Sequence, residues 1–518
     1  MSELSRRGAR LLEHPALSAP PVAVVAERAR RYRARRRLRA GVATCVAAAV
    51  LATGVAWQAA ESPGSAPAPV SRAAGPVRAL PAPQVAGVPA GPPPASGPPG
   101  TWRLATFLSE PLSWSRNDSS GPAAGGFLSC PQVGTCYYAA GPGGGSPSGP
   151  GLNRDTLYVS HDGGRSWAAL RLPSDVNFTT ALACPAARDC LAGAEVAGQP
   201  ALLATGDGGD SWSYRALPSG DGVIRELTCS AEDSCDALAW RPGAILGLPT
   251  GTWFLTTSDA GARWSRLSFP AGDTIAALSC FTAADCVAVG TSGGRAGPAG
   301  GQLGVALRTA DAGRTWTAGR LPAGTSFSPG ISPAVACAGA ATCYALGDHP
   351  QRYHPAGPIR LPGGGTMRTG VCISRGTRPG GRDCKPPAYI LAGAVAVSVD
   401  GGASWRLLAL PPNTPQPELF GLSCPTAQAC WIAGMQAVGQ AIPGGAYNGG
   451  SAMILGTGDG GATWAKATFA AIRLATGQQA DSLMAVGEIS CPAVNSCVGI
   501  SVADQGSYHT PVYTNAGG

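Results

Sequence analysis

The feature that most constrains the fold is a pair of short motifs that alternate along residues 101–518. One motif is two cysteines with five residues between them, and the other is an acidic, glycine-rich octet that ends in tryptophan, such as SHDGGRSW at residues 160–167. The seven cysteine pairs are Cys130/Cys136, Cys184/Cys190, Cys229/Cys235, Cys280/Cys286, Cys337/Cys343, Cys424/Cys430 and Cys491/Cys497. Because a motif that recurs along a chain marks a repeat architecture, these pairs predict seven copies of one structural unit.

Each unit has the pattern of four short strands. In the first copy, the segments FLSC, CYYAAG, TLYVS and WAALRLP are rich in apolar, β-branched or aromatic residues, and Gly, Pro, Ser or Asp separates them. A charged content of only 13%, with 74 glycines and 47 prolines, also favours strands and turns over helices. Four-stranded antiparallel units repeated seven times predict an all-β, seven-bladed β-propeller, because ring closure protects the sheet edges that a linear array would expose.

Six copies of the octet follow the pattern S/T-x-D-x-G-x-x-W, which resembles the Asp-box, or bacterial neuraminidase repeat, family. Sialidases, photosystem assembly-factor-like propellers and many bacterial surface proteins share this repeat. The resemblance covers nearly all of residues 101–518 and implies an octet between the third and fourth strands of each blade. The aspartates of the six octets are Asp162, Asp207, Asp259, Asp311, Asp400 and Asp459.

The composition of the octet favours a structural role. A tight turn needs a carboxylate that accepts backbone N–H groups, a glycine that tolerates positive φ, and a large side chain that anchors the turn to the sheet. Six carboxylates on six blades would be widely separated, whereas acid–base chemistry needs groups that converge on one substrate. We therefore expect six structural turns, with calcium binding as the alternative.

The two ends of residues 101–518 carry what look like the halves of a seventh octet. The chain finishes YTNAGG at residues 513–518, and the segment GTWRLATFL, which includes Trp102, supplies the missing tryptophan. The N-terminal strand is therefore predicted to complete the seventh blade.

The regular spacing of the cysteines predicts disulfide bonds in an oxidising compartment. An interval of five residues puts each pair on the two sides of a hairpin, with Cα atoms expected ~4.5–5.5 Å apart. Zinc is the alternative, but isolated pairs on different blades do not supply four converging ligands, so no metal is expected. Cys372 and Cys384 predict an eighth disulfide.

The positive charge lies at the N-terminus. Residues 1–40 contain eleven arginines and three glutamates, which account for the whole formal charge of +8, so a nucleic-acid footprint over the whole protein is not supported. Residues 41–60 contain no charged residue and as a helix would extend ~30 Å, enough to cross a bilayer. A cleaved signal peptide is the alternative, but the exit sequence WQAA fits a cleavage site poorly.

These observations predict the domain order. A basic cytoplasmic segment, 1–40, precedes a single transmembrane helix, 41–60, because arginines mark the cytoplasmic side. Residues 61–100 contain twelve prolines among Ala, Gly and Ser, which predicts an extended linker outside the cell. Residues 101–518 form the propeller, so we expect a single-pass protein of the cell membrane with an extracytoplasmic propeller.

The strand pattern separates a uniform end of the propeller from a variable one. The cysteine hairpins and octets share one end, while the connections at the other end differ in every blade, which is where binding specificity usually resides. The fifth unit carries an insertion that is rich in basic residues. Its candidate ligand-binding arginines are Arg352, Arg360, Arg368, Arg375, Arg378 and Arg382. The insertion is interpreted either as a solvated loop or as an anion-binding lobe for an acidic cell-wall glycopolymer, an anionic headgroup or an acidic protein patch.

Glu226 and Glu488 are the two acidic residues at a position that the seven units share, three residues before the first cysteine. The resemblance to sialidases implies an arginine cluster, a tyrosine–glutamate nucleophile and an acidic aspartate, but no arginine triad is in register. We therefore expect a non-catalytic binding or assembly module without a cofactor, in which Glu226 and Glu488 are further candidate ligand-binding residues. A sialidase-like glycoside hydrolase is the alternative.

Overall fold

The computed structural model describes residues 101–109, 126–140, 157–218, 222–242, 249–296, 302–327, 334–352, 359–360, 366–367, 389–412, 414, 417–437, 450–469, 485–502 and 509–515. All of them belong to one compact unit, Pro89–Gly518. The predicted cytoplasmic segment, transmembrane helix and linker lie outside the described residues. Within the described part of the chain, no helix has the length and hydrophobicity that crossing a membrane requires.

The described strands form seven four-stranded antiparallel sheets, which are numbered as blades in chain order. Blade 1 contains β2 (Gly126–Gln132), β3 (Thr135–Ala140), β4 (Leu157–Ser160) and β5 (Ala168–Leu170). Blade 2 contains β6 (Val176–Ala183), β7 (Cys190–Val196), β8 (Gln199–Thr205) and β9 (Ser213–Arg215). Blade 3 contains β10 (Val223–Cys229), β11 (Cys235–Pro242), β12 (Pro249–Thr257) and β13 (Ser265–Ser268). Blade 4 contains β14 (Asp273–Cys280), β15 (Cys286–Ala296), β16 (Gln302–Thr309) and β17 (Thr317–Ala318).

The remaining blades follow the same order. Blade 5 contains β18 (Ala334–Cys337), β19 (Cys343–Arg352), β22 (Tyr389–Ser398) and β23 (Arg406–Leu408). Blade 6 contains β24 (Pro417–Ser423), β25 (Cys430–Ala437), β26 (Gly450–Thr457) and β27 (Ala465–Lys466). Blade 7 contains β28 (Ala485–Ala493), β29 (Ser496–Val502), β30 (His509–Thr514) and β1 (Arg103–Ser109). The insertion in blade 5 adds a small hairpin of β20 (Ile359–Arg360) and β21 (Thr366–Met367).

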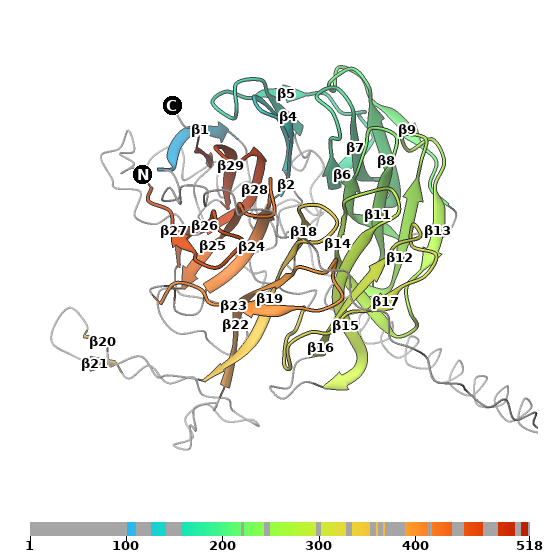
Figure 1. Cartoon of the computed structure of the whole chain (residues 1–518). Helices are drawn as coiled ribbons and strands as arrows, with labels where there is room; N and C mark the ends of the chain where they lie inside the picture. Colours follow the sequence, from blue (N-terminus) through green and yellow to red (C-terminus); the bar gives the residue numbers. More distant parts are fainter. Residues whose placement is uncertain are drawn as a thin grey trace, which may run out of the picture. The chain divides into compact units, whose positions relative to one another are not determined.

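The seven sheets close into a ring. The first strand of each blade contacts the first strand of the next, and β28 of blade 7 contacts β2 of blade 1 (Figure 1). The hydrophobic core is divided accordingly, because one cluster of buried side chains lies between each pair of neighbouring blades. The prediction of an all-β, seven-bladed propeller with four-stranded antiparallel blades is confirmed.

The N-terminal strand completes blade 7, as predicted. β1 pairs with β30 along its length, from Arg103 opposite Thr514 to Ser109 opposite His509. Immediately before β1, the N–H of Trp102 donates to the carbonyl of Thr468 at 3.0 Å, which ties the strand to blade 6 as well. The ring is therefore sealed by pairing between the two ends of the described chain.

The first strand of five blades contains an irregularity at the same place. The register shifts four residues before the first cysteine, between Thr179/Ala181, Ile224/Glu226, Ile275/Ala277, Leu419/Gly421 and Val486/Glu488. Such bulges bend a strand and change the direction of nearby side chains. Glu226 and Glu488 are each the first paired residue after a bulge, so the bulge helps to set where their carboxyl groups point.

Candidate functional site

The octets form self-contained turns, illustrated by residues 309–316. The hydroxyl of Thr309 donates to Asp311 Oδ1 at 2.7 Å and accepts the N–H of Gly313 at 3.0 Å. Asp311 Oδ1 also accepts the N–H of Thr315 at 2.8 Å, and Asp311 Oδ2 accepts its hydroxyl at 2.6 Å. These hydrogen bonds hold the pKa of Asp311 down at about 2, since each of them favours the charged form. The carboxylate is therefore occupied within its own turn.

The glycine of the octet also packs against the preceding blade. Gly313 has a φ of 78°, and a Cβ atom there would lie 2.4 Å from the ring of Phe254 in blade 3. The ring of Trp316 meets Phe254 edge to face, with centroids 5.4 Å apart. The octet thus closes a turn and at the same time contributes to the packing between blades.

Each octet is also attached to the cysteine hairpin of its own blade. In all six, the N–H of the residue after the aspartate donates to the carbonyl two residues before the second cysteine, as from Ala312 to Ala284 at 2.9 Å. The same bond joins Gly163 to Gly134, Gly208 to Arg188, Ala260 to Asp233, Gly401 to Ala341 and Gly460 to Gln428. The six aspartates that precede these donors are Asp162, Asp207, Asp259, Asp311, Asp400 and Asp459, and their structural role stays a prediction.

All seven predicted hairpin disulfides are formed. Their Cα atoms lie 4.0–4.1 Å apart, closer than the ~4.5–5.5 Å expected from facing strand residues. The predicted pair of Cys372 and Cys384 lies outside the described residues.

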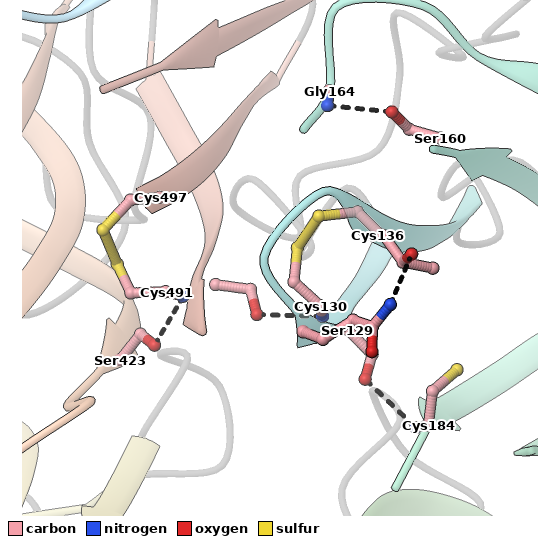
Figure 2. The surroundings of a disulfide bond; sticks show 12 residues. Ser129, Cys130, Cys136, Ser160, Gly164, Cys184, Ser423, Cys491 and Cys497 are labelled. Carbon is pink, nitrogen blue, oxygen red and sulfur yellow. Dashed lines mark hydrogen bonds between the residues drawn. A yellow bond between two sulfur atoms is a disulfide. The ribbon is translucent and has the colours of Figure 1, made fainter. Parts of the chain in front are cut away.

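A serine directly before the first cysteine links neighbouring blades, and sequence reasoning missed this contact. Ser129 Oγ of blade 1 accepts the N–H of Cys184 in blade 2 at 3.0 Å (Figure 2). Ser423 Oγ accepts the N–H of Cys491 at 2.9 Å in the same way (Figure 2). Ser279 and Ser490 do the same for Cys337 and Cys130. The recurring letters SC in FLSC, ALSC, GLSC and EISC were the available signal.

Glu226 and Glu488 come together at the middle of the ring. They lie on β10 and β28, the first strands of blades 3 and 7, which are not neighbours, so their charges interact across the centre. Glu226 Oε2 accepts the N–H of Leu278, on β14 of blade 4, at 2.7 Å. Each side chain keeps partial contact with solvent although protein surrounds it on most sides.

The environment of these two glutamates favours the protonated form. Burial raises the pKa of Glu226 to about 8, and the negative charge of Glu488 adds to the shift, while the bond from Leu278 opposes it. Burial likewise raises the pKa of Glu488 to about 8. Among the described residues, no arginine contributes to either shift. Burial therefore favours the protonated form of both carboxyl groups, and the charge of Glu488 adds to this effect at Glu226.

A second acidic pair lies toward the variable end of blades 5 and 6. Asp348 on β19 is buried, its Oδ2 has no hydrogen-bond partner, and burial with the charge of Glu418 raises its pKa to about 6. Glu418 is the second residue of β24. Sequence reasoning missed both residues, because neither occupies a position that the seven units share.

Blade 3 also carries a stack of arginine and tryptophan side chains that was not anticipated from the sequence. The guanidinium groups of Arg241 and Arg266 lie 4.9 Å and 4.3 Å from the ring centroid of Trp253. Both arginines are exposed, and Arg241 lies next to the end of β11, where the chain enters a variable connection. On β10, the guanidinium of Arg225 lies 5.1 Å from the ring of Trp240.

The arginines predicted in the blade 5 insertion are only partly placed. Arg352 is the last residue of β19, and Arg360 lies in β20. Arg368, Arg375, Arg378 and Arg382 lie outside the described residues. Their role in ligand binding stays a prediction.

No protein-family model and no curated protein matches the chain. Among solved structures, YCF48 bound to D1 peptide is similar at 15% identity, with a TM-score of 0.46, over 82% of this chain and 99% of that chain. The GH74 xyloglucanase from Xanthomonas campestris is similar at 16% identity, with a TM-score of 0.45, over 78% of this chain and 52% of the enzyme.

The endosialidase of phage phi92 is similar at 10% identity, with a TM-score of 0.36, over 80% of this chain and 68% of that chain. These similarities concern the propeller fold. They include a peptide-bound protein as well as hydrolases, so they do not select one activity.

Proposed function

We propose that this chain is a membrane-anchored, extracytoplasmic propeller of the Asp-box type that binds an anionic ligand at its variable end without transforming it. The ligand would be an acidic glycopolymer or an acidic protein surface. The observation that carries the proposal is the stack in which the exposed Arg241, at the variable end of β11, and the exposed Arg266, in the outer strand β13, share the ring of Trp253.

Stacking suits arginine for the recognition of anions. A guanidinium group placed over an indole ring is held in one plane by the cation–π attraction. The N–H groups lie around the edge of that plane, where they bind carboxylate or phosphate oxygens in pairs. An arginine that is already ordered loses less conformational freedom when a ligand binds.

The opposite end of the propeller is less suited to the task. Its octets use their carboxylates and hydroxyls within their own turns, and their backbone N–H groups bind the cysteine hairpins. The variable end differs from blade to blade, and the arginine-rich insertion of blade 5 extends from it after β19. The six arginines predicted there belong to the same proposal.

The proposal is tested by binding of the full-length protein, in detergent, to an acidic glycopolymer and to a neutral one over a salt series. The variant Arg241→Ala/Arg266→Ala removes the stack. The matched control is Arg263→Ala/Arg314→Ala, which removes the same charge from two exposed octet arginines of blades 3 and 4. A third variant, Arg375→Ala/Arg378→Ala/Arg382→Ala, tests the insertion.

We expect the parent and the octet control to bind the acidic polymer alike and the stack variant to bind at least about tenfold more weakly, since an arginine hot spot contributes a few kcal/mol. Binding of the parent should fall with salt, because the screening length shortens from ~10 Å at 0.1 M to ~3 Å at 1 M. Equal binding by the stack variant and the octet control would contradict the proposed site.

A glycoside hydrolase is the second candidate, and the paired carboxyl groups of Glu226 and Glu488 favour it. Hydrolysis of a glycosidic bond uses one protonated and one ionised carboxyl group, and the raised pKa values of Glu226 and Glu488, about 8 for each, favour the protonated form that a general acid needs. The test is release of reducing sugar or sialic acid from a glycan panel, with Glu226→Gln and Glu488→Gln as controls. Turnover that both variants abolish would favour the hydrolase.

The membrane anchor is proposed from the sequence of residues 1–60, which lie outside the described residues. In intact cells, an external protease should digest the propeller and leave an epitope tag before residue 1 protected. Deletion of residues 41–60 should move the protein out of the membrane fraction. A tag that is digested in intact cells would contradict the proposed orientation.

A further inference from the structure

Blade 3 holds a buried carboxyl group beside a disulfide of blade 4. Asp236 follows the second cysteine of blade 3 directly and is 1% exposed. Its Oδ1 atom has no hydrogen-bond partner, and its Oδ2 atom lies 3.9 Å from Cys286 Sγ. Burial raises the pKa of Asp236 to about 7, against the opposing hydrogen bond from Thr256.

No other blade places an acid at this position. The equivalent residues are Tyr137, Leu191, Val287, Tyr344, Trp431 and Val498. The tyrosines use the position to connect blades, since the hydroxyl of Tyr137 donates to the carbonyl of Ala187 at 2.7 Å and that of Tyr344 to Ala427 at 3.0 Å. An acid with an unpaired oxygen makes no comparable contact, and burying it opposes folding.

Asp236 and the two cysteines of blade 4 form one compact cluster. The nearest ligand atoms of Asp236, Cys280 and Cys286 all lie within 4.8 Å of one another. The sulfurs are joined in a disulfide, and metal binding requires thiolates, so the cluster is not a metal centre in the oxidised protein. Proton transfer to a sulfur that leaves the disulfide is the chemistry that this arrangement does provide.

We propose that Cys280–Cys286 is a redox-active disulfide, unlike the other six hairpin disulfides that the structure describes, and that Asp236 is its proton donor. Cys280 is 6% exposed and Cys286 is 1% exposed, so an incoming thiolate reaches Cys280 Sγ more readily. The leaving sulfur is then that of Cys286, the one beside Asp236 Oδ2.

The exchange balances with a dithiol as the reductant. One thiolate of the dithiol attacks Cys280 Sγ, the Cys280–Cys286 bond breaks, and the thiolate that forms on Cys286 takes the proton of the Asp236 carboxyl group. The second thiol of the reductant attacks the mixed disulfide and releases Cys280 as a thiol, which leaves the reductant oxidised. Asp236 regains its proton from water. In the reverse direction, the Asp236 carboxylate accepts the proton of the Cys286 thiol.

The other disulfides serve as internal references for the test. The folded, full-length protein is treated with dithiothreitol at pH 6, samples are trapped with N-ethylmaleimide, and mass spectrometry follows the opening of each pair. The variants are Asp236→Asn, which keeps the shape, and Asp236→Val, which installs the residue type of blades 4 and 7. The matched control is Asp285→Asn in the hairpin of the same disulfide, where the Asp285 carboxylate accepts the hydroxyl of Thr282.

We expect Cys280–Cys286 to open at least about tenfold faster than the median of the other pairs, a threshold set below the ~10²–10⁴-fold that a positioned acid contributes in catalysis. Both Asp236 variants should slow the opening of Cys280–Cys286 about tenfold. The other disulfides should open at unchanged rates in these variants, and Cys280–Cys286 should open at the parent rate in Asp285→Asn. Circular dichroism, together with the opening rates of the other disulfides, shows whether a variant remains folded. Opening of Cys280–Cys286 at the reference rate in the parent, or an unchanged rate in either folded variant, would overturn the proposal.

Discussion

The ring of Trp102 meets the ring of Trp431 edge to face, with centroids 5.9 Å apart and planes at 76°. Trp102 is fully buried, and it precedes the strand that completes blade 7, whereas Trp431 belongs to blade 6. The contact fastens the N-terminal strand, which pairs with β30, to a blade other than its own.

Replacing Trp102 by alanine should therefore lower the free energy of unfolding by about 3–5 kcal/mol, the usual cost of emptying a buried aromatic site. Denaturant unfolding followed by circular dichroism measures this loss. Trp102→Phe should lose less, and Val133→Ala, at a hairpin side chain that is 61% exposed, should change little. An unaltered midpoint for Trp102→Ala would contradict closure through β1.

The octet of blade 3 lacks one hydrogen bond that the other octets make. Arg263 occupies the place where Ser166, Ser211, Thr315, Ser404 and Thr463 donate a hydroxyl to the aspartate. Arg263→Thr should add this bond and raise the free energy of unfolding by about 0.5–1.5 kcal/mol. Comparison of melting temperatures with Arg263→Ala separates the new bond from removal of the arginine. A lower melting temperature for Arg263→Thr than for Arg263→Ala would show that the threonine hydroxyl does not stabilise this octet.

The octets should also set the acid stability of the propeller. Hydrogen bonds lower the pKa of Asp311 and Asp400 to about 2, below the ordinary value of 3.8, so the charged form favours the folded state. This contribution is present above about pH 4 and is lost as the pH falls through about 2. The variant Asp311→Asn/Asp400→Asn should be less stable at pH 6 and lose less between pH 4 and pH 2, measured by denaturant unfolding. Asp210→Asn, at an exposed aspartate, is the control.

The central glutamates should have the opposite effect at alkaline pH. Their pKa values are raised to about 8, above 4.5, so the folded protein holds these protons more tightly than the unfolded chain. The contribution of these two glutamates to the stability of the folded state is fully present below about pH 4.5 and is lost as the pH rises through about 8. Glu226→Gln/Glu488→Gln should melt at a higher temperature than the parent at pH 9 and show a flatter pH profile. Glu232→Gln, in an exposed turn, should follow the parent.

The repeats account for what the sequence predicted well. Seven cysteine pairs and six octets fixed the number of blades, the hairpin disulfides and the completion of blade 7, because these features recur in each unit or sit at the chain ends. The interaction of Glu226 with Glu488 was not predicted. Their shared position in the repeat was visible in the sequence, but that position alone does not show that the carboxyl groups of blades 3 and 7 lie close enough to interact.

The features that escaped prediction depend on contacts between different blades or strands. Asp236 looks like an ordinary strand residue until blade 4 places Cys286 beside it. Arg241 and Arg266 are far apart in sequence, and only the pairing of β11, β12 and β13 brings both onto Trp253. Asp348 and Glu418 belong to neighbouring blades and repeat nowhere else.

The most direct test of binding without transformation is a single incubation that measures both. The full-length protein is equilibrated with an acidic glycopolymer of defined length at low salt, and the bound polymer is then recovered and its mass distribution determined. We expect saturable, salt-sensitive retention that Arg241→Ala/Arg266→Ala weakens, with polymer of unchanged mass and sugar composition. Recovery of shortened or desialylated polymer from the parent, but not from Glu226→Gln/Glu488→Gln, would contradict this and identify a hydrolase instead.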